Sequence, residues 1–473
     1  MCFFLILKIF NKDNYNFKVE KVLSFIGEIE LQINNNINQL LKPILIARDL
    51  QQEYLKFQKG KESSEFNSNN IEEFQSKKEN IEKIKLLFEE QEKVKENPFI
   101  IEINKKIPID ILQLLSLEFG DNKEFLEFKK TPAWPTNNSL IYKRPLIKDK
   151  DNYYCFIPTV LFRNIGYILE AWIKEKDLNY FHNIYQKRRS KYLEKKSLEY
   201  FKKLLPKSKI YGELYYDFIE DGQKKRVSTD GLVLFDENLF IIEAKAGSLS
   251  IPSKRGGLKE LKSEIGELID KAYIQALRTK KYINENPNPR FEDAKGETQL
   301  IIRDKNKYKN IFLINTTLYS IDQISLSLNS LRRWNLLKGS EWLWSIYIND
   351  LRIISELIEI PSIFIYYLKQ RIIANDHPKF RTADELDYLM FYYKKGLYFK
   401  DGILDNLTAF MPTGFTEDLD RYYDYKAGRV SDGKKPILEI NKDYKKLILD
   451  IEETNKLGFT RINTILLGFD KVT

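Results

Sequence analysis

The stretch TDGLVLFDENLFIIEAKAG, residues 229–247, contains two apolar runs separated by the polar residues Asp-Glu-Asn and therefore predicts a tight β-hairpin. One acid, Asp230, stands at the front of the first run, and Glu243 and Lys245 stand at the end of the second. Charged side chains are almost never fully buried unless they are paired or bind a metal. Their presence at the ends of two buried strands therefore needs a physical explanation.

The hairpin brings these three side chains together in either of two registers. If the turn lies at residues 236–237, Asp230 faces Glu243; if it shifts by one residue, Asp230 faces Lys245. Glu243 and Lys245 are two residues apart, so they project from the same face of the sheet. Two carboxylates and one lysine in a small volume favour a site for a hard divalent cation such as Mg²⁺. The alternative is a structural salt bridge at the rim of the sheet.

The composition limits which chemistry is available. The chain has 473 residues, 43% hydrophobic and 31% charged, so it should fold into two to four globular domains. Its two cysteines and two histidines exclude a disulfide scaffold and a cysteine-rich zinc site, and they disfavour a serine or cysteine hydrolase that depends on histidine. Catalysis would have to rest on carboxylates and lysines. The net charge of +9 is a weak indication of a polyanionic partner.

The opening segment MCFFLILKIF is apolar but shorter than the roughly 20 residues that a membrane helix needs. We expect a buried first strand or helix there, with a peripheral anchor as the alternative. No other segment approaches membrane length, so we expect a cytoplasmic protein with no membrane partner.

The pattern along the chain predicts four regions. Residues 1–135 should be mainly helical, with a charge-dense helix at 73–97 that either covers a core or forms a short coiled coil. Residues 136–184 should form a hairpin, turning at 150–152, and a helix. Residues 321–473 should again be mainly helical and rich in aromatic residues, with a helix that starts at a capping box of Thr382 and Glu385.

The remaining region, 185–320, predicts the element order αβββαβ. A helix should end at residues 205–206, and the helix at 258–284 is long enough to cross over to a parallel strand. The expected strands are 210–219, 227–235, 239–245 and 311–319. Together these elements predict a mixed α+β core, a mixed sheet flanked by helices.

Asp230, twelve intervening residues and then Glu243-Ala-Lys245, within an αβββαβ core, resemble the PD-(D/E)XK superfamily of restriction-endonuclease-like nucleases. The resemblance covers about residues 185–320, and Thr229 stands where the proline of the motif would be. It is closest to the nuclease-related (NERD) and RecB-like branches. It implies a Mg²⁺-dependent nuclease, with Mn²⁺ able to substitute, that cuts DNA rather than RNA in bacterial DNA processing or antiviral defence.

The superfamily often carries an acid on its first helix, and this chain offers Glu194 and Glu199. Leu198, Phe201 and Leu205 define the apolar stripe of the predicted helix, and Glu194 lies one turn before Leu198 on that stripe. Glu199 falls on a lysine-rich side. We therefore expect Glu194 to be the third metal ligand.

The resemblance also implies a glutamine on the second helix, for which Gln275 is the candidate, although Thr279 takes the place of a tyrosine that often follows. An interfacial amide is the alternative for Gln275. Glu213 is a reserve ligand. Lys254 and Arg255, in a glycine-containing loop after the hairpin, would contact phosphates, or they belong to an ordinary surface loop.

These expectations combine into one mechanism. Asp230, Glu243 and Glu194 hold the metal, Lys245 serves the attacking water, and Gln275 assists. The flanking helical regions are expected to carry oligomerisation or partner-protein contacts. The alternatives are a non-catalytic nucleic-acid-binding module with a nuclease-like fold and a helical scaffold with an incidental sheet.

Overall fold

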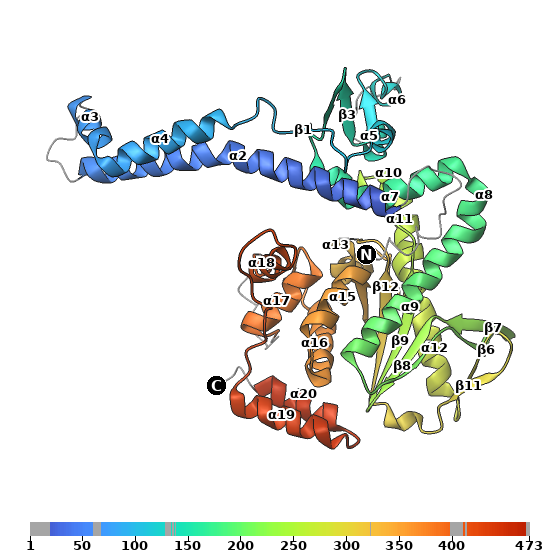
Figure 1. Cartoon of the computed structure of the whole chain (residues 1–473). Coiled ribbons are helices and arrows are strands. Elements are labelled where there is room, and N and C mark those ends of the chain that lie inside the picture. Colours follow the sequence, from blue (N-terminus) through green and yellow to red (C-terminus); the bar gives the residue numbers. More distant parts are fainter. Residues whose placement is uncertain are drawn as a thin grey trace. The chain divides into compact units, whose positions relative to one another are not determined.

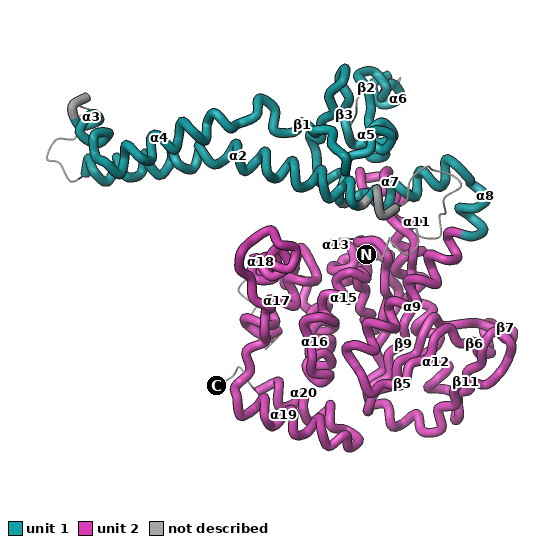
Figure 2. The backbone as a smooth tube through the Cα atoms, viewed as in Figure 1, with its two compact units in different colours: residues 1–184 teal, residues 185–473 magenta. Residues whose placement is uncertain are grey.

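The computed structural model describes residues 19–59, 68–127, 134, 137, 139–321, 323–397, 410–411 and 414–469. The chain is a mixed α/β protein that divides into two compact units, residues 1–184 and residues 185–473 (Figure 2). The segment MCFFLILKIF lies outside the described residues, so its predicted structure is untested. None of the described helices is both long enough and apolar enough to cross a bilayer.

The first unit combines a long helical hairpin with a small sheet (Figure 1). Helix α2 packs against α4, which is shorter than the helix predicted at 73–97. The four strands have the order β1-β4-β3-β2, and Asp149 pairs with Asn152 across the predicted turn. Strands β1 and β2 were not predicted. The element bounds are α2 Val19–Lys59, α3 Ser68–Ser76, α4 Lys78–Glu92, β1 Ile100–Ile101, α5 Ile109–Leu115, β2 Ser116–Glu118, α6 Lys123–Leu126, β3 Leu146–Asp149, β4 Asn152–Tyr154, α7 Pro158–Lys176 and α8 Leu178–Tyr180.

The second unit is built on a five-stranded sheet with the order β13-β12-β9-β8-β5. Its strands are β5 Lys209–Tyr211, β8 Gly231–Phe235, β9 Asn238–Lys245, β12 Asn310–Thr317 and β13 Leu343–Tyr347. Strand β8 is antiparallel to β5 and β9, whereas β12 is parallel to β9 and β13. The predicted parallel strand at 311–319 and the mixed character of the sheet are therefore confirmed. Strand β13 was not predicted.

Two helices cover opposite faces of this sheet (Figure 1). Helix α9, Gln186–Leu204, packs its Phe201 against Phe240 of β9. Helix α12, Lys271–Glu285, contributes Tyr273 to a core that contains Ile241 of the same strand. Because neighbouring side chains of a strand point to opposite faces, odd-numbered residues of β9 face α12 and even-numbered ones face α9.

The prediction of three continuous strands before the crossover helix is wrong in detail. The first breaks at residues 212–213 into β5 and β6, and the second breaks at Asp230 into β7 and β8. Strands β6 and β7 join an unpredicted hairpin in a separate antiparallel sheet with the order β11-β10-β6-β7. Because of these breaks, one continuous segment contributes β5 and β8 to the first sheet and β6 and β7 to the second. The bounds are β6 Leu214–Glu220, β7 Gln223–Thr229, β10 Arg290–Glu292 and β11 Thr298–Ile301.

The predicted crossover helix is also interrupted. It consists of α11, Leu258–Ile265, a π-helical turn over Gly266–Asp270 and α12. Shorter helices complete the unit, and several of them cover the α9 face of the sheet. They are α10 Ile251–Lys254, α13 Gln323–Leu326, α14 Leu328–Arg333, α15 Ile348–Leu357, α16 Pro361–Ile373, α17 Glu385–Lys395, α18 Glu417–Lys426, α19 Lys442–Thr454 and α20 Phe459–Phe469.

A buried ion pair anchors α17 to α16. Arg371 Nε donates to Glu385 at 2.9 Å, and Trp344 Nε1 and Tyr367 OH donate to the same carboxylate. The predicted capping box at Thr382 is wrong, because Asp384 caps the helix by accepting from the backbone N–H of Leu386. Glu385 therefore has a structural role in this part of the fold.

Candidate active site

The observed register selects one of the two alternatives for the central hairpin. Gly231 pairs with Ile242 and Phe235 with Asn238, so the turn lies at residues 236–237. Asp230 directly precedes β8, and its Oδ2 accepts a hydrogen bond of 2.7 Å from the backbone N–H of Ala244. This bond fixes the Asp230 carboxylate beside the far end of β9, as the hairpin predicts.

Glu243 is the most deeply buried acid of the site, with 1% of its surface exposed. Its Oε1 accepts a hydrogen bond of 2.9 Å from Thr229 Oγ1. Burial raises the pKa of Glu243 well above its ordinary value, and the neighbouring Asp230 raises it further, whereas Lys245 and Thr229 oppose the shift. The Thr229 hydroxyl therefore orients the buried carboxylate of Glu243.

Asp230 shares this electrostatic environment. Burial raises its pKa, while the hydrogen bond from Ala244 and the positive charges of Lys245 and Lys191 lower it. Two neighbouring acids whose pKa values are both raised by burial are typical of functional sites rather than of surface ion pairs. A divalent cation bound by the two acids would instead lower both pKa values.

Lys245 and Gln275 meet across the α12 face of the sheet, where Lys245 Nζ donates a hydrogen bond to Gln275 Oε1. Gln275 therefore lies beside Lys245, and its role in a site stays a prediction. Thr279, one turn after Gln275 on α12, is buried, and its hydroxyl forms a hydrogen bond of 2.9 Å with Tyr216 OH of β6. A tyrosine hydroxyl thus reaches this part of α12 from a strand instead of from the helix itself.

The two candidate acids of α9, Glu194 and Glu199, differ in exposure in the way that the predicted orientation of the helix requires. The Glu194 side chain is 14% exposed, whereas that of Glu199 is 42% exposed and pairs with Lys196. The fully buried positions of α9 are Leu193, Ser197, Phe201 and Leu204, so the stripe is rotated slightly from the predicted one. Leu198 is half-buried and packs against Gly231, where an added Cβ would lie 2.7 Å from Leu198 Cδ2.

Lys191 is a functional candidate that the sequence reasoning missed. Its Nζ donates to Glu194 Oε2 at 2.9 Å and to Glu213 Oε2 at 2.8 Å. Burial raises the pKa of Glu194, Lys191 lowers it, and Asp230 raises it again. The pKa of Lys191 is raised because the two acids outweigh the effect of its own burial. The reserve acid Glu213 thus shares a counter-ion with Glu194, and the spacing of Lys191 one turn before Glu194 was the available signal.

Arg278 is a second missed residue. It lies three residues after Gln275 on α12, and its positive charge lowers the pKa of the buried Glu243. Its Nε is buried and has no hydrogen-bond partner among the described residues. The sequence signal for Arg278 was its position three residues after Gln275, which places both side chains on the same side of the helix.

The predicted phosphate-binding loop follows β9 closely. Lys254 ends the short helix α10 and is exposed, and Arg255 caps that helix. Gly256 has a φ of +95°, and an added Cβ at Gly257 would lie 2.9 Å from the carbonyl oxygen of Pro252. The loop therefore has a defined, glycine-dependent shape, but the role of its two basic residues stays a prediction.

The donor set fits a hard cation with few protein ligands. In the described ranges, no group of three or more His, Cys, Asp or Glu side chains is arranged to hold a metal ion. Asp230 and Glu243 each use one carboxylate oxygen in a described hydrogen bond. Mg²⁺ commonly takes only one or two carboxylates and keeps several waters, so this pair suits it. Glu194 is bound to Lys191, and its role as a third ligand stays a prediction.

Comparison with known proteins gives no relative for this chain: no protein-family model, curated protein or solved structure matches it. The function of the site must be inferred from its own geometry and chemistry.

Proposed function

We propose that residues 185–473 form a Mg²⁺-dependent nuclease that hydrolyses phosphodiester bonds of DNA, with an αβββαβ core of the PD-(D/E)XK type. One observation carries the proposal. Asp230 and Glu243 lie together at the end of a buried hairpin, on a sheet with a parallel crossover strand, and Lys245 lies beside them with its amine held by Gln275.

The two carboxylates would bind the metal and through it the substrate. A bound Mg²⁺ would supply a Lewis acid that polarises the scissile phosphate. Asp230 and Glu243 supply hard oxygen donors, and burial prevents water from competing for them. The hydrogen bonds from Ala244 and Thr229 fix the two carboxylates before the substrate arrives.

Lys245 would act on the attacking water and on the phosphate. Its amine can orient that water and offset the negative charge that develops on the phosphate oxygens. Gln275 Oε1 accepts from this amine and so limits its positions. Gln275 is therefore a positioning residue.

Glu194 and Lys191 would regulate how tightly the site binds its cation. In the metal-free protein, the positive charge of Lys191 partly neutralises the negative charges of Glu194 and Glu213. Glu194 lies close enough to Asp230 for that acid to raise its pKa, and it would supply a further oxygen donor to a cation held by Asp230 and Glu243.

The direct test is a panel of substrates. Purified full-length protein is incubated with linear and circular double-stranded DNA, single-stranded DNA and RNA, with Mg²⁺, Mn²⁺ or EDTA. We expect cleavage of DNA with Mg²⁺ or Mn²⁺ and none with EDTA. Saturable DNA binding without cleavage under every metal condition would instead favour the non-catalytic binding module. Cleavage by Glu199→Gln at the wild-type rate serves as a control for the helix surface.

A further inference from the structure

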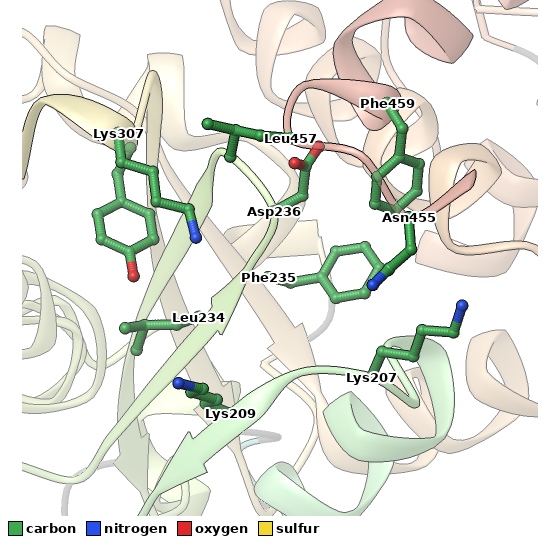
Figure 3. Close-up of a pocket in the computed structure, with 10 residues that line it drawn as sticks. Lys207, Lys209, Leu234, Phe235, Asp236, Lys307, Asn455, Leu457 and Phe459 are labelled. Atoms are coloured by element: carbon green, nitrogen blue, oxygen red, sulfur yellow. The ribbon is translucent and has the colours of Figure 1, made fainter. Parts of the chain in front are cut away.

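A second pocket lies at the opposite end of the same hairpin from the carboxylates. It has a volume of about 340 Å³ and surrounds Leu234, Phe235 and Asp236, next to the hairpin turn (Figure 3). Five strand steps separate Phe235 from Asp230, which corresponds to about 17 Å. The pocket is thus distinct from the proposed active site.

Three lysines from two separate segments surround this pocket. Lys207 and Lys209 come from the α9–β5 connection and β5, and Lys307 comes from the segment before β12 (Figure 3). Within the described part of the chain, none of the three ammonium groups forms an ion pair. What distinguishes the three lysines is that all of them line one hollow. Like charges around one hollow repel one another unless an anion compensates them.

The nearby acids compensate the charge of the lysines only in part, and each of these acids also accepts hydrogen bonds from the backbone. Asp236 accepts from the backbone N–H groups of Gly458 and Thr460, at 2.7 and 3.0 Å. Burial raises the pKa of Glu452, which Lys207 partly lowers, and Glu452 Oε1 accepts a hydrogen bond of 2.8 Å from the backbone N–H of Ser362. Asp304 accepts from the backbone N–H of Lys307. Among the described residues that line the hollow, Asp236 is the one acid, beside three lysines.

The walls of the pocket also offer apolar surface. Leu457 is 63% exposed at its edge, and the half-buried ring of Tyr308 forms another part of the wall. A neighbouring hollow of about 420 Å³ shares Lys209, Leu234, Lys307 and Tyr308 with it. Small-molecule sites commonly have volumes of about 300–1,000 Å³ and combine apolar walls with a few charged groups.

We propose that this lysine pocket binds a nucleoside di- or triphosphate as an effector. Lys207, Lys209 and Lys307 would hold the phosphate chain, whose charge they match, and Tyr308 and Leu457 would contact the base or ribose. The pocket walls include the β8–β9 turn and the start of α20, and the same β8–β9 hairpin carries Asp230 and Glu243 at its other end. A ligand in the pocket would therefore contact the element that holds the proposed catalytic acids.

Calorimetric titration of the full-length protein in EDTA with ATP, ADP and tripolyphosphate tests this proposal. We expect saturable ATP binding that is tighter than tripolyphosphate binding. Lys209→Ala and Lys307→Ala should each weaken ATP binding about tenfold, the loss expected of one charge-assisted contact. Lys203→Ala, which removes one charge from the exposed side of α9, is the matched control and should bind as wild type does.

Asp230→Asn should also bind ATP normally, since it lies in the other site. Absence of saturable binding, equal affinity for ATP and tripolyphosphate, or wild-type affinity in both lysine variants would each overturn the proposal. Preference for a single-stranded oligonucleotide over ATP would overturn it too, and would assign the lysines to a nucleic-acid groove.

Discussion

Replacing Glu243 with glutamine should stabilise the metal-free protein. The substitution keeps the volume and the acceptor for Thr229 but removes a charge from a side chain that is 1% exposed and lies beside Asp230. A raised pKa means that the charged form of Glu243 is disfavoured in the folded protein, so removing its charge relieves an unfavourable interaction. Because the positive charge of Lys245 offsets part of this interaction, we expect a gain of about 1–2 kcal/mol, within the usual range of single substitutions. Such a change raises Tm by several degrees.

The gain should depend on pH with a defined sign. The pKa of Glu243 is raised in the folded protein above its ordinary value of 4.5. Between these two values the folded state binds more protons than the unfolded state, so the carboxyl group lowers stability as pH rises. Below pH 4.5 the acid is protonated in both states and glutamine gives no advantage. The gain should therefore be small near pH 5 and larger near pH 8.

The assay is thermal unfolding of wild type, Glu243→Gln and Glu199→Gln in EDTA at both pH values. Glu199→Gln is the matched control, and on an exposed helix face it should change stability by no more than about 0.5 kcal/mol. Added Mg²⁺ should stabilise wild type but not Glu243→Gln, because only wild type keeps both ligands. A Glu243→Gln variant that is destabilised at pH 8, or one whose gain is equal at both pH values, would refute this reasoning.

Three further predictions test other parts of the chain. Gln275→Ala should lower the cleavage rate and leave KM nearly unchanged, because the Lys245 amine loses its hydrogen-bond acceptor. A pH–rate profile identical to that of wild type would contradict this positioning role. Reversing the charge of Lys254 and Arg255 should weaken DNA binding and reduce the slope of log K against log salt concentration by about one unit per lost contact. An unchanged slope would show that this loop does not contact the DNA phosphates. Glu385→Ala should lower the free energy of unfolding by about 3–5 kcal/mol, as measured by urea denaturation, because it leaves a buried arginine unpaired.

The sequence predicted the hairpin and its neighbours because their signals are local. Alternating and apolar runs, a polar turn and a long helix before the next strand define β8, β9, α12 and β12. The same logic located Asp230, Glu243 and Lys245, and helical phase distinguished Glu194 from Glu199.

What the sequence did not predict depends on tertiary context. The breaks at residues 212–213 and at Asp230 occur because one segment pairs with two different sheets, and no local pattern requires that. Strand β13 is a short apolar run among helices, which periodicity cannot distinguish from a buried helical turn. Lys191 pairs with Glu194 on its own helix and with Glu213, which directly precedes β6. Its role is therefore visible only when the fold brings α9 and the start of β6 together.

The measurement that tests the central claim most directly is DNA cleavage by wild type and Asp230→Asn under single-turnover conditions, with and without Mg²⁺. The variant keeps the side-chain volume but replaces one carboxylate ligand with an amide, and DNA binding in EDTA is measured in parallel. We predict that wild type cleaves only with Mg²⁺, and that Asp230→Asn loses cleavage by orders of magnitude while it binds DNA as before. Cleavage by Asp230→Asn at the wild-type rate, or cleavage by wild type in EDTA, would contradict the assignment of these carboxylates as a catalytic metal site.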